Sequence, residues 1–137
     1  MKETCTYLSV LNPEQLEAVC HTGSPLLILA GAGSGKTRVI TTKIAWLIAE
    51  QGVQPESILA VTFTNKAARE MAERARLLDE RTGRSVIRTF HSFGAWMLRR
   101  YAEWAGLSPR FTIYDDDDAV MLLMKAQPQL NKQDAQK

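Results

Sequence analysis

The sequence has little of several features that mark other classes of protein. It has two cysteines, Cys5 and Cys20, and their spacing fits no metal site. They allow one disulfide, but we expect reduced thiols in a cytosolic protein. The N-terminus lacks the apolar stretch of a signal peptide, and no apolar run approaches the length of a membrane span. We therefore expect a cytoplasmic protein that has no membrane segment.

The chain also lacks an excess of charge of one sign. Its net charge is +2 over 137 residues, which does not by itself indicate a polyanionic partner. The charges are nevertheless distributed unevenly. Residues 1–110 carry 14 basic and 10 acidic side chains, whereas residues 111–137 carry 3 and 5. Any surface that binds nucleic acid should therefore lie in the first part. With 45% hydrophobic residues, the chain can form one domain with a core.

Residues 25–37 join three features that bind a triphosphate when they occur in this order. The apolar run 25–29 predicts a buried strand, a glycine-rich turn follows, and Lys36 and Thr37 open a helix. Backbone N–H groups of such a turn surround an anion, and the helix N-terminus adds positive potential. Lys36 can reach the β- and γ-phosphates of ATP, and the Thr37 hydroxyl can ligate Mg²⁺. The other loop residues expected to bind the nucleotide are Ala30, Gly31, Ala32, Gly33, Ser34 and Gly35.

Strands and helices alternate along the chain. Apolar and β-branched runs predict strands over residues 25–29, 58–63 and 85–90. Apolar residues at helical spacing predict helices over about 13–21, 35–51, 66–81, 92–105 and 116–126. Such alternation is typical of an α/β fold with a parallel sheet and flanking helices. Ligands bind beyond the carboxyl ends of such strands, so the turns 30–36, 63–65 and 90–92 should share one face.

Two of these turns combine aromatic, hydroxyl and amide side chains. Phe63, Thr64 and Asn65 follow the second expected strand, and Phe90 and His91 follow the third. A base of single-stranded nucleic acid can stack on an aromatic ring, while phosphates meet hydroxyls and a helix N-terminus. The alternative is a core Phe63 beside an Asn65 that caps a helix. We expect His91 to contact nucleic acid and not to act as an acid or base.

Other conspicuous residues have structural explanations. Trp96, Tyr101 and Trp104 recur at helical spacing and are expected to lie in the core. The acidic run 115–118 is expected to cap a helix, since no hydrophobic strand of the kind that precedes a Walker B acid leads into it. On the helix of residues 66–81, Glu70 and Arg74 are expected to pair on the outer side.

The first helix carries a further candidate. Asn12 is its expected N-cap, and Leu16, Val19 and Cys20 are expected to face inward. Gln15 alone would be a surface residue, but its amide can both donate to and accept from an adenine edge.

In this order, the segments resemble the opening of a superfamily 1A DNA helicase of the UvrD/Rep/PcrA type. The stretches that carry the resemblance are residues 11–15 (the Q motif), 30–38 (motif I), 60–71 (motif Ia), 89–92 (motif Ib) and 111–115 (the entry to an inserted helical subdomain). The resemblance implies a RecA-like ATP-binding domain 1A that begins in residues 1–110. Residues 111–137 would then start the inserted subdomain 1B.

The resemblance also implies activities and roles. The family is ATP-driven, uses Mg²⁺ and moves 3′ to 5′ along single-stranded DNA in repair or replication. By carry-over, Gln15 would read adenine, Lys36 would stabilise the transferring phosphoryl group and Arg38 would lie near the nucleotide. Thr37 would hold Mg²⁺. The residues implied to touch DNA are Phe63, Thr64, Asn65, Phe90 and His91.

Several parts of the family pattern have no match in these 137 residues. The Asp-Glu pair that completes the Mg²⁺ site, the later motifs and the arginine finger are all missing. We therefore expect an N-terminal fragment, from a truncated chain or a partial gene, that neither unwinds DNA nor hydrolyses ATP appreciably. An open strand edge should favour its self-association. Two alternatives remain: another phosphate-loop enzyme such as a small-molecule kinase, and a non-catalytic nucleotide-binding module that regulates a partner.

Overall fold

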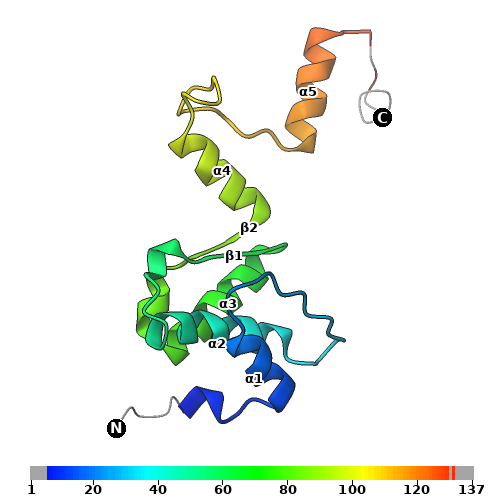
Figure 1. The fold of residues 1–137 in the computed structure, drawn as a ribbon. Helices are drawn as coiled ribbons and strands as arrows, with labels where there is room; N and C mark the ends of the chain where they lie inside the picture. The colour runs from blue at the N-terminus through cyan, green and yellow to red at the C-terminus, as the bar shows by residue number, and fades with distance from the viewer. Residues whose placement is uncertain (1–5, 130, 132–137) are drawn as a thin grey trace. The chain divides into compact units, whose positions relative to one another are not determined.

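The computed structural model describes residues 6–129 and 131 (Figure 1). Within these residues it contains five α-helices, three 3₁₀ helices and two β-strands. The α-helices are α1 (Pro13–Cys20), α2 (Lys36–Ala49), α3 (Asn65–Leu78), α4 (Phe90–Arg100) and α5 (Asp116–Ala126). The strands are β1 (Leu59–Thr62) and β2 (Val86–Thr89), and the 3₁₀ helices are η1 (Thr6–Leu8), η2 (Pro55–Ser57) and η3 (Glu80–Arg84). The mixed α/β class expected from the sequence is confirmed.

By packing, the chain divides into two compact units between Gly94 and Ala95, inside α4. Each unit is a group of residues that contact one another, whereas the predicted boundary separates two domains defined by a family. The boundary expected between residues 110 and 111 therefore stays a prediction. Among the described residues, no helix has both the length and the apolar character that crossing a membrane requires.

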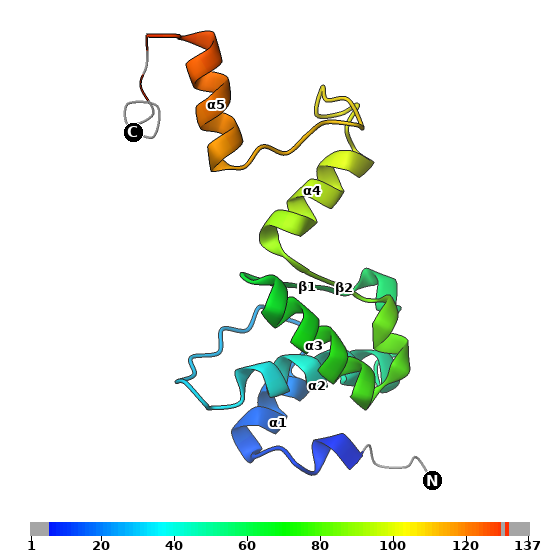
Figure 2. The same cartoon turned by 180° about the vertical axis from the view of Figure 1, so that it is seen from behind.

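The sheet of the first unit consists of two parallel strands. β1 pairs with β2 in a register that sets Leu59 opposite Val86 and Thr62 opposite Thr89. The chain between them forms α3 and η3, as a parallel crossover requires. In both views α2 and α3 lie on one side of this strand pair (Figures 1 and 2). Because the strands run the same way, the turns after Thr62 and Thr89 leave the sheet at the same edge.

The prediction of a strand over residues 25–29 is wrong. This segment has no regular secondary structure and forms part of an open loop beside α1 and α2 (Figure 2). Its exposure alternates as in an extended chain: 45% at Leu26, 82% at Leu27, 43% at Ile28 and 88% at Leu29. The residues favour an extended backbone, but a strand also needs a neighbour for its hydrogen bonds. In the part of the chain that the structure describes, the sheet ends with β1 and β2.

The core of the first unit is organised around α2, which packs against both α1 and α3. Val19 of α1 is fully buried against Val39 and Trp46 of α2. Leu16 and Cys20 were expected to face inward as well, but both are exposed. The short α1 reaches the core through Val19 as its one buried residue. The predicted state of the Cys5 thiol lies outside the described residues.

The expected core position of three aromatic residues in the second unit is also wrong. Trp96, Tyr101 and Trp104 are 36%, 52% and 93% exposed. Among the described residues of this unit, the buried hydrophobic ones are Ala102 and Val120, which leave too little apolar surface to cover the rings.

The capping prediction for the acidic run is confirmed. The Asp115 carboxylate accepts a hydrogen bond from the Asp118 backbone N–H (2.8 Å). The Asp118 carboxylate in turn accepts one from the Asp115 N–H (3.4 Å). These two bonds form a capping box at the start of α5.

Candidate functional site

The glycine-rich loop reaches α2 through two left-handed residues. Gly33 has φ +74° and Gly35 has φ +86°, a region that residues with a Cβ rarely adopt. Gly35 is the N-cap of α2, and no side chain forms a capping hydrogen bond there. The backbone N–H groups of the first turn have no partners within the helix. This helix N-terminus is therefore suited to an anion, as the sequence predicts.

Lys36 is bonded to the loop itself. Its ammonium donates to the carbonyl oxygens of Ala30 (3.1 Å) and Gly31 (2.6 Å). The Ser34 hydroxyl donates to the same Gly31 carbonyl at 2.8 Å. To reach a phosphate, the ammonium would have to exchange these carbonyl groups for phosphate oxygens. A lysine can do so because its charge lies at the end of a flexible stem.

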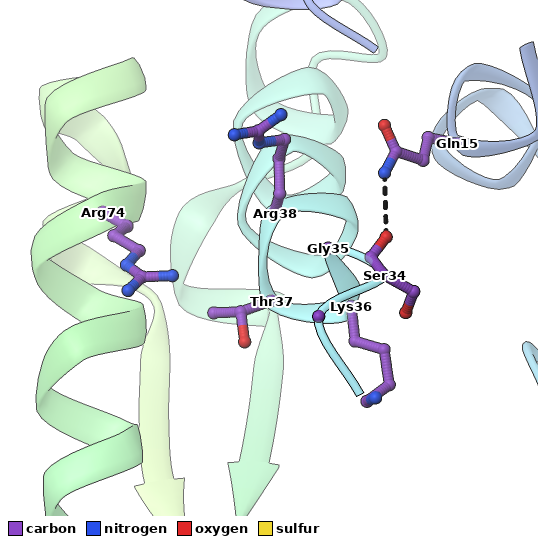
Figure 3. A pocket seen from close by; sticks show the side chains of 8 residues that line it. Gln15, Ser34, Gly35, Lys36, Thr37, Arg38 and Arg74 are labelled. Atoms are coloured by element: carbon purple, nitrogen blue, oxygen red, sulfur yellow. Dashed lines mark hydrogen bonds between the residues drawn. The ribbon is translucent and has the colours of Figure 1, made fainter. Parts of the chain in front are cut away.

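Gln15 lies beside this loop although 19 positions separate it from Ser34. Its side-chain amide donates to the Ser34 carbonyl oxygen at 3.0 Å (Figure 3). Its side-chain oxygen accepts from the Asn12 backbone N–H at 3.1 Å, and the Asn12 side chain accepts from the Gln15 N–H at 2.8 Å. This capping box starts α1 and confirms Asn12 as the N-cap. Each end of the Gln15 amide thus has a protein partner. An amide has two N–H donors and an oxygen that can accept two hydrogen bonds, so these two bonds leave capacity for a further partner.

A cavity of about 400 Å³ brings together seven of the ten residues predicted to bind the nucleotide. The other three, Ala30, Gly31 and Ala32, are exposed and are not part of its lining. It is lined by Gln15, Gly33, Ser34, Gly35, Lys36, Thr37, Arg38 and Arg74. This volume falls within the range of small-molecule sites. The Thr37 side chain is half-buried in the cavity wall, at the first turn of α2. A threonine hydroxyl fits Mg²⁺, which also keeps water and phosphate oxygens as ligands. No group of three metal-ligating side chains occurs among the described residues.

The sequence reasoning missed Arg74 as a residue of this cavity. Its expected pair with Glu70 is confirmed, at 3.7 Å between exposed side chains. The same guanidinium extends from α3 toward α2 and faces the phosphate loop side of the cavity (Figure 3). Spacing along α3 identifies the Glu70 pair, but only the packing of α3 on α2 brings Arg74 to the loop. No signal in the single sequence could have found it.

The turns after β1 and β2 form an exposed aromatic pair. Phe63 is 87% exposed and Phe90 is 51% exposed, so Phe63 is not a core residue. Their ring centroids lie 5.4 Å apart, with the ring planes 46° to each other. The parallel register of β1 and β2 produces this contact. It confirms that the turns 63–65 and 90–92 share one face.

Hydroxyl groups fix the backbone of both turns. Thr64, not Asn65, caps α3: its hydroxyl oxygen accepts from the Ala67 N–H at 3.1 Å. Asn65 is instead the first residue of the helix, and it is exposed. In the other turn, the Thr89 hydroxyl oxygen accepts from the Ser92 N–H at 3.1 Å. His91 is exposed in the first turn of α4.

Comparison with known proteins gives consistent matches over nearly the whole chain. A family model described as the UvrD/REP helicase N-terminal domain matches residues 11–137. The ATP-dependent DNA helicase UvrD1 of Mycobacterium leprae is 56% identical over 119 residues, which cover 85% of this chain and 15% of that protein. The probable DNA helicase II homolog of Mycoplasma capricolum is 49% identical over 125 residues, 90% of this chain and 17% of the relative. The ATP-dependent DNA helicase PcrA of Staphylococcus aureus is 52% identical over 112 residues, which cover 81% of this chain and 15% of that protein. The matches thus span between 15% and 18% of the relatives' own length.

Proposed function

Since the chain belongs to the UvrD/REP helicase N-terminal domain family, we propose that it is the ATP-binding segment of a DNA helicase. The observation that carries this proposal is the single cavity that joins Gln15 to the loop from Gly33 to Arg38. Residues 1–110 would belong to a RecA-like domain 1A, and residues 111–137 would begin the inserted subdomain 1B. The family match argues against the kinase alternative.

ATP would bind with its phosphates at the loop and the N-terminus of α2. The backbone N–H groups of Ala32, Gly33, Ser34 and Gly35, together with those that open α2, would surround the β- and γ-phosphates. Lys36 would leave its carbonyl partners to neutralise phosphate charge, and Arg74 would add a second cation from α3. Bound Mg²⁺ would neutralise charge on the phosphates, with the Thr37 hydroxyl as its protein ligand. Gln15 would pair with the adenine edge through its second N–H and the second lone pair of its oxygen, beside Arg38.

Single-stranded DNA would bind across the face formed by the two turns. Phe63 and Phe90 together offer an exposed aromatic surface on which a base can stack. Thr64, Asn65 and His91 lie beside that surface and would meet the DNA backbone. We further propose 3′ to 5′ movement of the whole protein, a role in DNA repair or replication, and a cytoplasmic location.

The 137 residues alone would bind ATP without turning it over appreciably. Phosphoryl transfer requires groups that position water and stabilise the transition state, and the Asp-Glu pair and arginine finger of the family have no match in the sequence. We therefore propose that the isolated chain does not unwind DNA. Robust Mg²⁺-dependent hydrolysis by the pure chain would refute this part of the proposal.

The test is a titration of the chain with a fluorescent ATP analogue, with and without Mg²⁺. Saturable binding that Lys36→Ala abolishes would support the proposal. The control is Lys125→Ala, which removes a cation from α5, outside the cavity, and should leave binding unchanged. Absence of binding by a sample with the circular dichroism of a folded protein would overturn it.

A second titration in the presence of a short oligothymidylate examines the DNA part. A change in nucleotide affinity on addition of the oligomer would support a helicase segment. A nucleotide affinity that is the same with and without the oligomer would instead favour a non-catalytic nucleotide-binding module.

A further inference from the structure

Lys43 connects α2 to the carboxyl end of α1. Its ammonium donates to three backbone carbonyl oxygens, those of Ala18 (3.1 Å), Val19 (3.1 Å) and His21 (2.6 Å). The last carbonyl groups of a helix have no partner within the helix and need one elsewhere. An ammonium has three donors, so one lysine meets three of these acceptors. Its positive charge also complements the negative end of the helix dipole.

The surroundings of Lys43 hold it in this position. Its ammonium lies 5.9 Å from the centre of the Trp46 ring, and Trp46 is buried next to Val19. Burial is the main cause that lowers the pKa of Lys43, and the nearby Cys20 acts in the opposite direction. The amine is thus a partly desolvated group with several fixed partners, unlike a lysine on an open surface.

The helix that Lys43 holds is the one that carries Gln15. α1 has eight residues and buries only Val19 among its side chains, so it is too short to be stable by itself. Two polar contacts fix it to the phosphate loop and α2. One is the bond from Gln15 to the Ser34 carbonyl at its start, and the other is the Lys43 cluster at its end. Without the second contact, the Gln15 bond would be the one left of these two polar contacts, beside the burial of Val19 against Val39 and Trp46.

We propose that Lys43 is a positioning residue that holds Gln15 at the nucleotide cavity and so makes the site selective for adenine. The inference rests on the function proposed above, and the ligand class is a purine nucleotide with a 6-amino group. Lys43 lines neither the cavity nor the loop, so it acts on the ligand through α1. Its loss should change the recognition of the base and leave the recognition of the phosphates intact.

The experiment compares the unchanged chain with Lys43→Met, which keeps the length of the side chain and removes its charge and donors. ATP, GTP and inorganic tripolyphosphate each displace the fluorescent ATP analogue. We expect Lys43→Met to lower the affinity for ATP about fivefold to tenfold, the effect of losing one well-placed hydrogen bond. The affinity for tripolyphosphate should stay within twofold. The preference for ATP over GTP should fall by the same factor. An unchanged preference, or tripolyphosphate weakened in parallel with ATP, would overturn the proposal.

Ile48→Val serves as the matched control for general loss of stability. Ile48 is buried on the same helix, and this substitution removes one buried methyl group. It should lower stability and leave the ATP to GTP ratio unchanged. If it shifts the ratio as much as Lys43→Met, the role of Lys43 is merely structural.

Hydrogen exchange of the α1 amides separates a failure of this inference from a failure of the proposed function. Lys43→Met should speed exchange across Pro13–Cys20 more than Ile48→Val does. Equal exchange in the two variants would overturn the role of Lys43 even if the chain binds ATP. If the unchanged chain binds no ATP, the proposed function is wrong, and this result is obtained before any variant is compared.

Discussion

Gln15 and Gly35 lie so close that no side chain larger than hydrogen fits between them. A Cβ on Gly35 would stand 2.7 Å from the Gln15 side-chain nitrogen. The far end of a glutamine can usually move aside, but this amide is held by Ser34 on one side and Asn12 on the other. Position 35 therefore excludes any side chain as long as Gln15 keeps these two hydrogen bonds.

Gly35→Ala should destabilise the fold. The new methyl group meets both a left-handed backbone and the bonded Gln15 amide, for an expected loss of about 1–3 kcal/mol in the free energy of unfolding. Gly33→Ala is the matched control, because Gly33 is also left-handed (φ +74°) but its Cβ would have no atom within 4 Å. Urea unfolding followed by circular dichroism measures both. Equal losses in the two variants would contradict the role given to the Gln15 contact.

Phe63→Ala should weaken the binding of single-stranded DNA. Stacking of one base on an aromatic ring contributes about 1–3 kcal/mol, so we expect affinity to fall between about 5-fold and 150-fold. The readout is fluorescence anisotropy of a labelled oligothymidylate. Trp104→Ala removes another exposed aromatic ring, outside the aromatic pair, and should leave the affinity unchanged. The stacking role fails if both variants bind equally well.

Much of the fold followed from local patterns. The Asn12 cap, the glycine-rich turn before Lys36 and the acidic run before α5 each mark a helix start, and each helix begins where its signal places it. The strands β1 and β2 were predicted correctly because each of these two apolar runs has the other as its hydrogen-bonding neighbour. Seven of the eight residues that line the cavity were predicted from the sequence as nucleotide-binding residues, since the loop motif and Gln15 are local signals.

The errors share a physical cause, which is dependence on partners that are distant in the sequence. The run 25–29 has strand-like residues, but strand formation needs a neighbour that periodicity does not reveal. Trp96 and Trp104 have helical spacing, but burial depends on what packs over them. Arg74 is assigned to a surface pair by spacing, and its place at the cavity comes from helix packing.

The acid stability of the chain should depend on Asp79. Hydrogen bonding from the Arg81 side chain is the main cause that lowers the pKa of Asp79, and their closest atoms are 2.6 Å apart. Because the folded pKa lies below the unfolded one, the carboxylate stabilises the fold above about pH 4. That contribution is lost as the pH falls through the folded pKa.

Asp79→Asn should therefore flatten the fall in stability below pH 4, as measured by urea unfolding at a series of pH values. Arg81→Ala should have a similar effect, and the double variant should add little to either. An acid profile that Asp79→Asn leaves unchanged would show that other carboxylates control it.

We expect self-association through the exposed apolar segment. Leu27 and Leu29 are 82% and 88% exposed, and an extended unpaired segment can pair with another copy. Sedimentation velocity should show a sedimentation coefficient that rises with concentration. Leu27→Lys combined with Leu29→Lys should abolish the rise, whereas Leu77→Lys, at an 86% exposed residue of α3, should not. A single monomer boundary for the unchanged chain at every concentration would exclude this association.

The parallel strand pair also has a consequence for the order of events during synthesis. β1 cannot pair until β2 has been translated, and Thr62 and Thr89 are 27 positions apart. The contact between α1 and α2 needs only the residues up to Ala49. Since a nascent chain emerges from its N-terminus, the phosphate loop can be complete while the aromatic pair is still half made. On the ribosome, the segment proposed to bind nucleotide would then be in place before the face proposed to bind DNA.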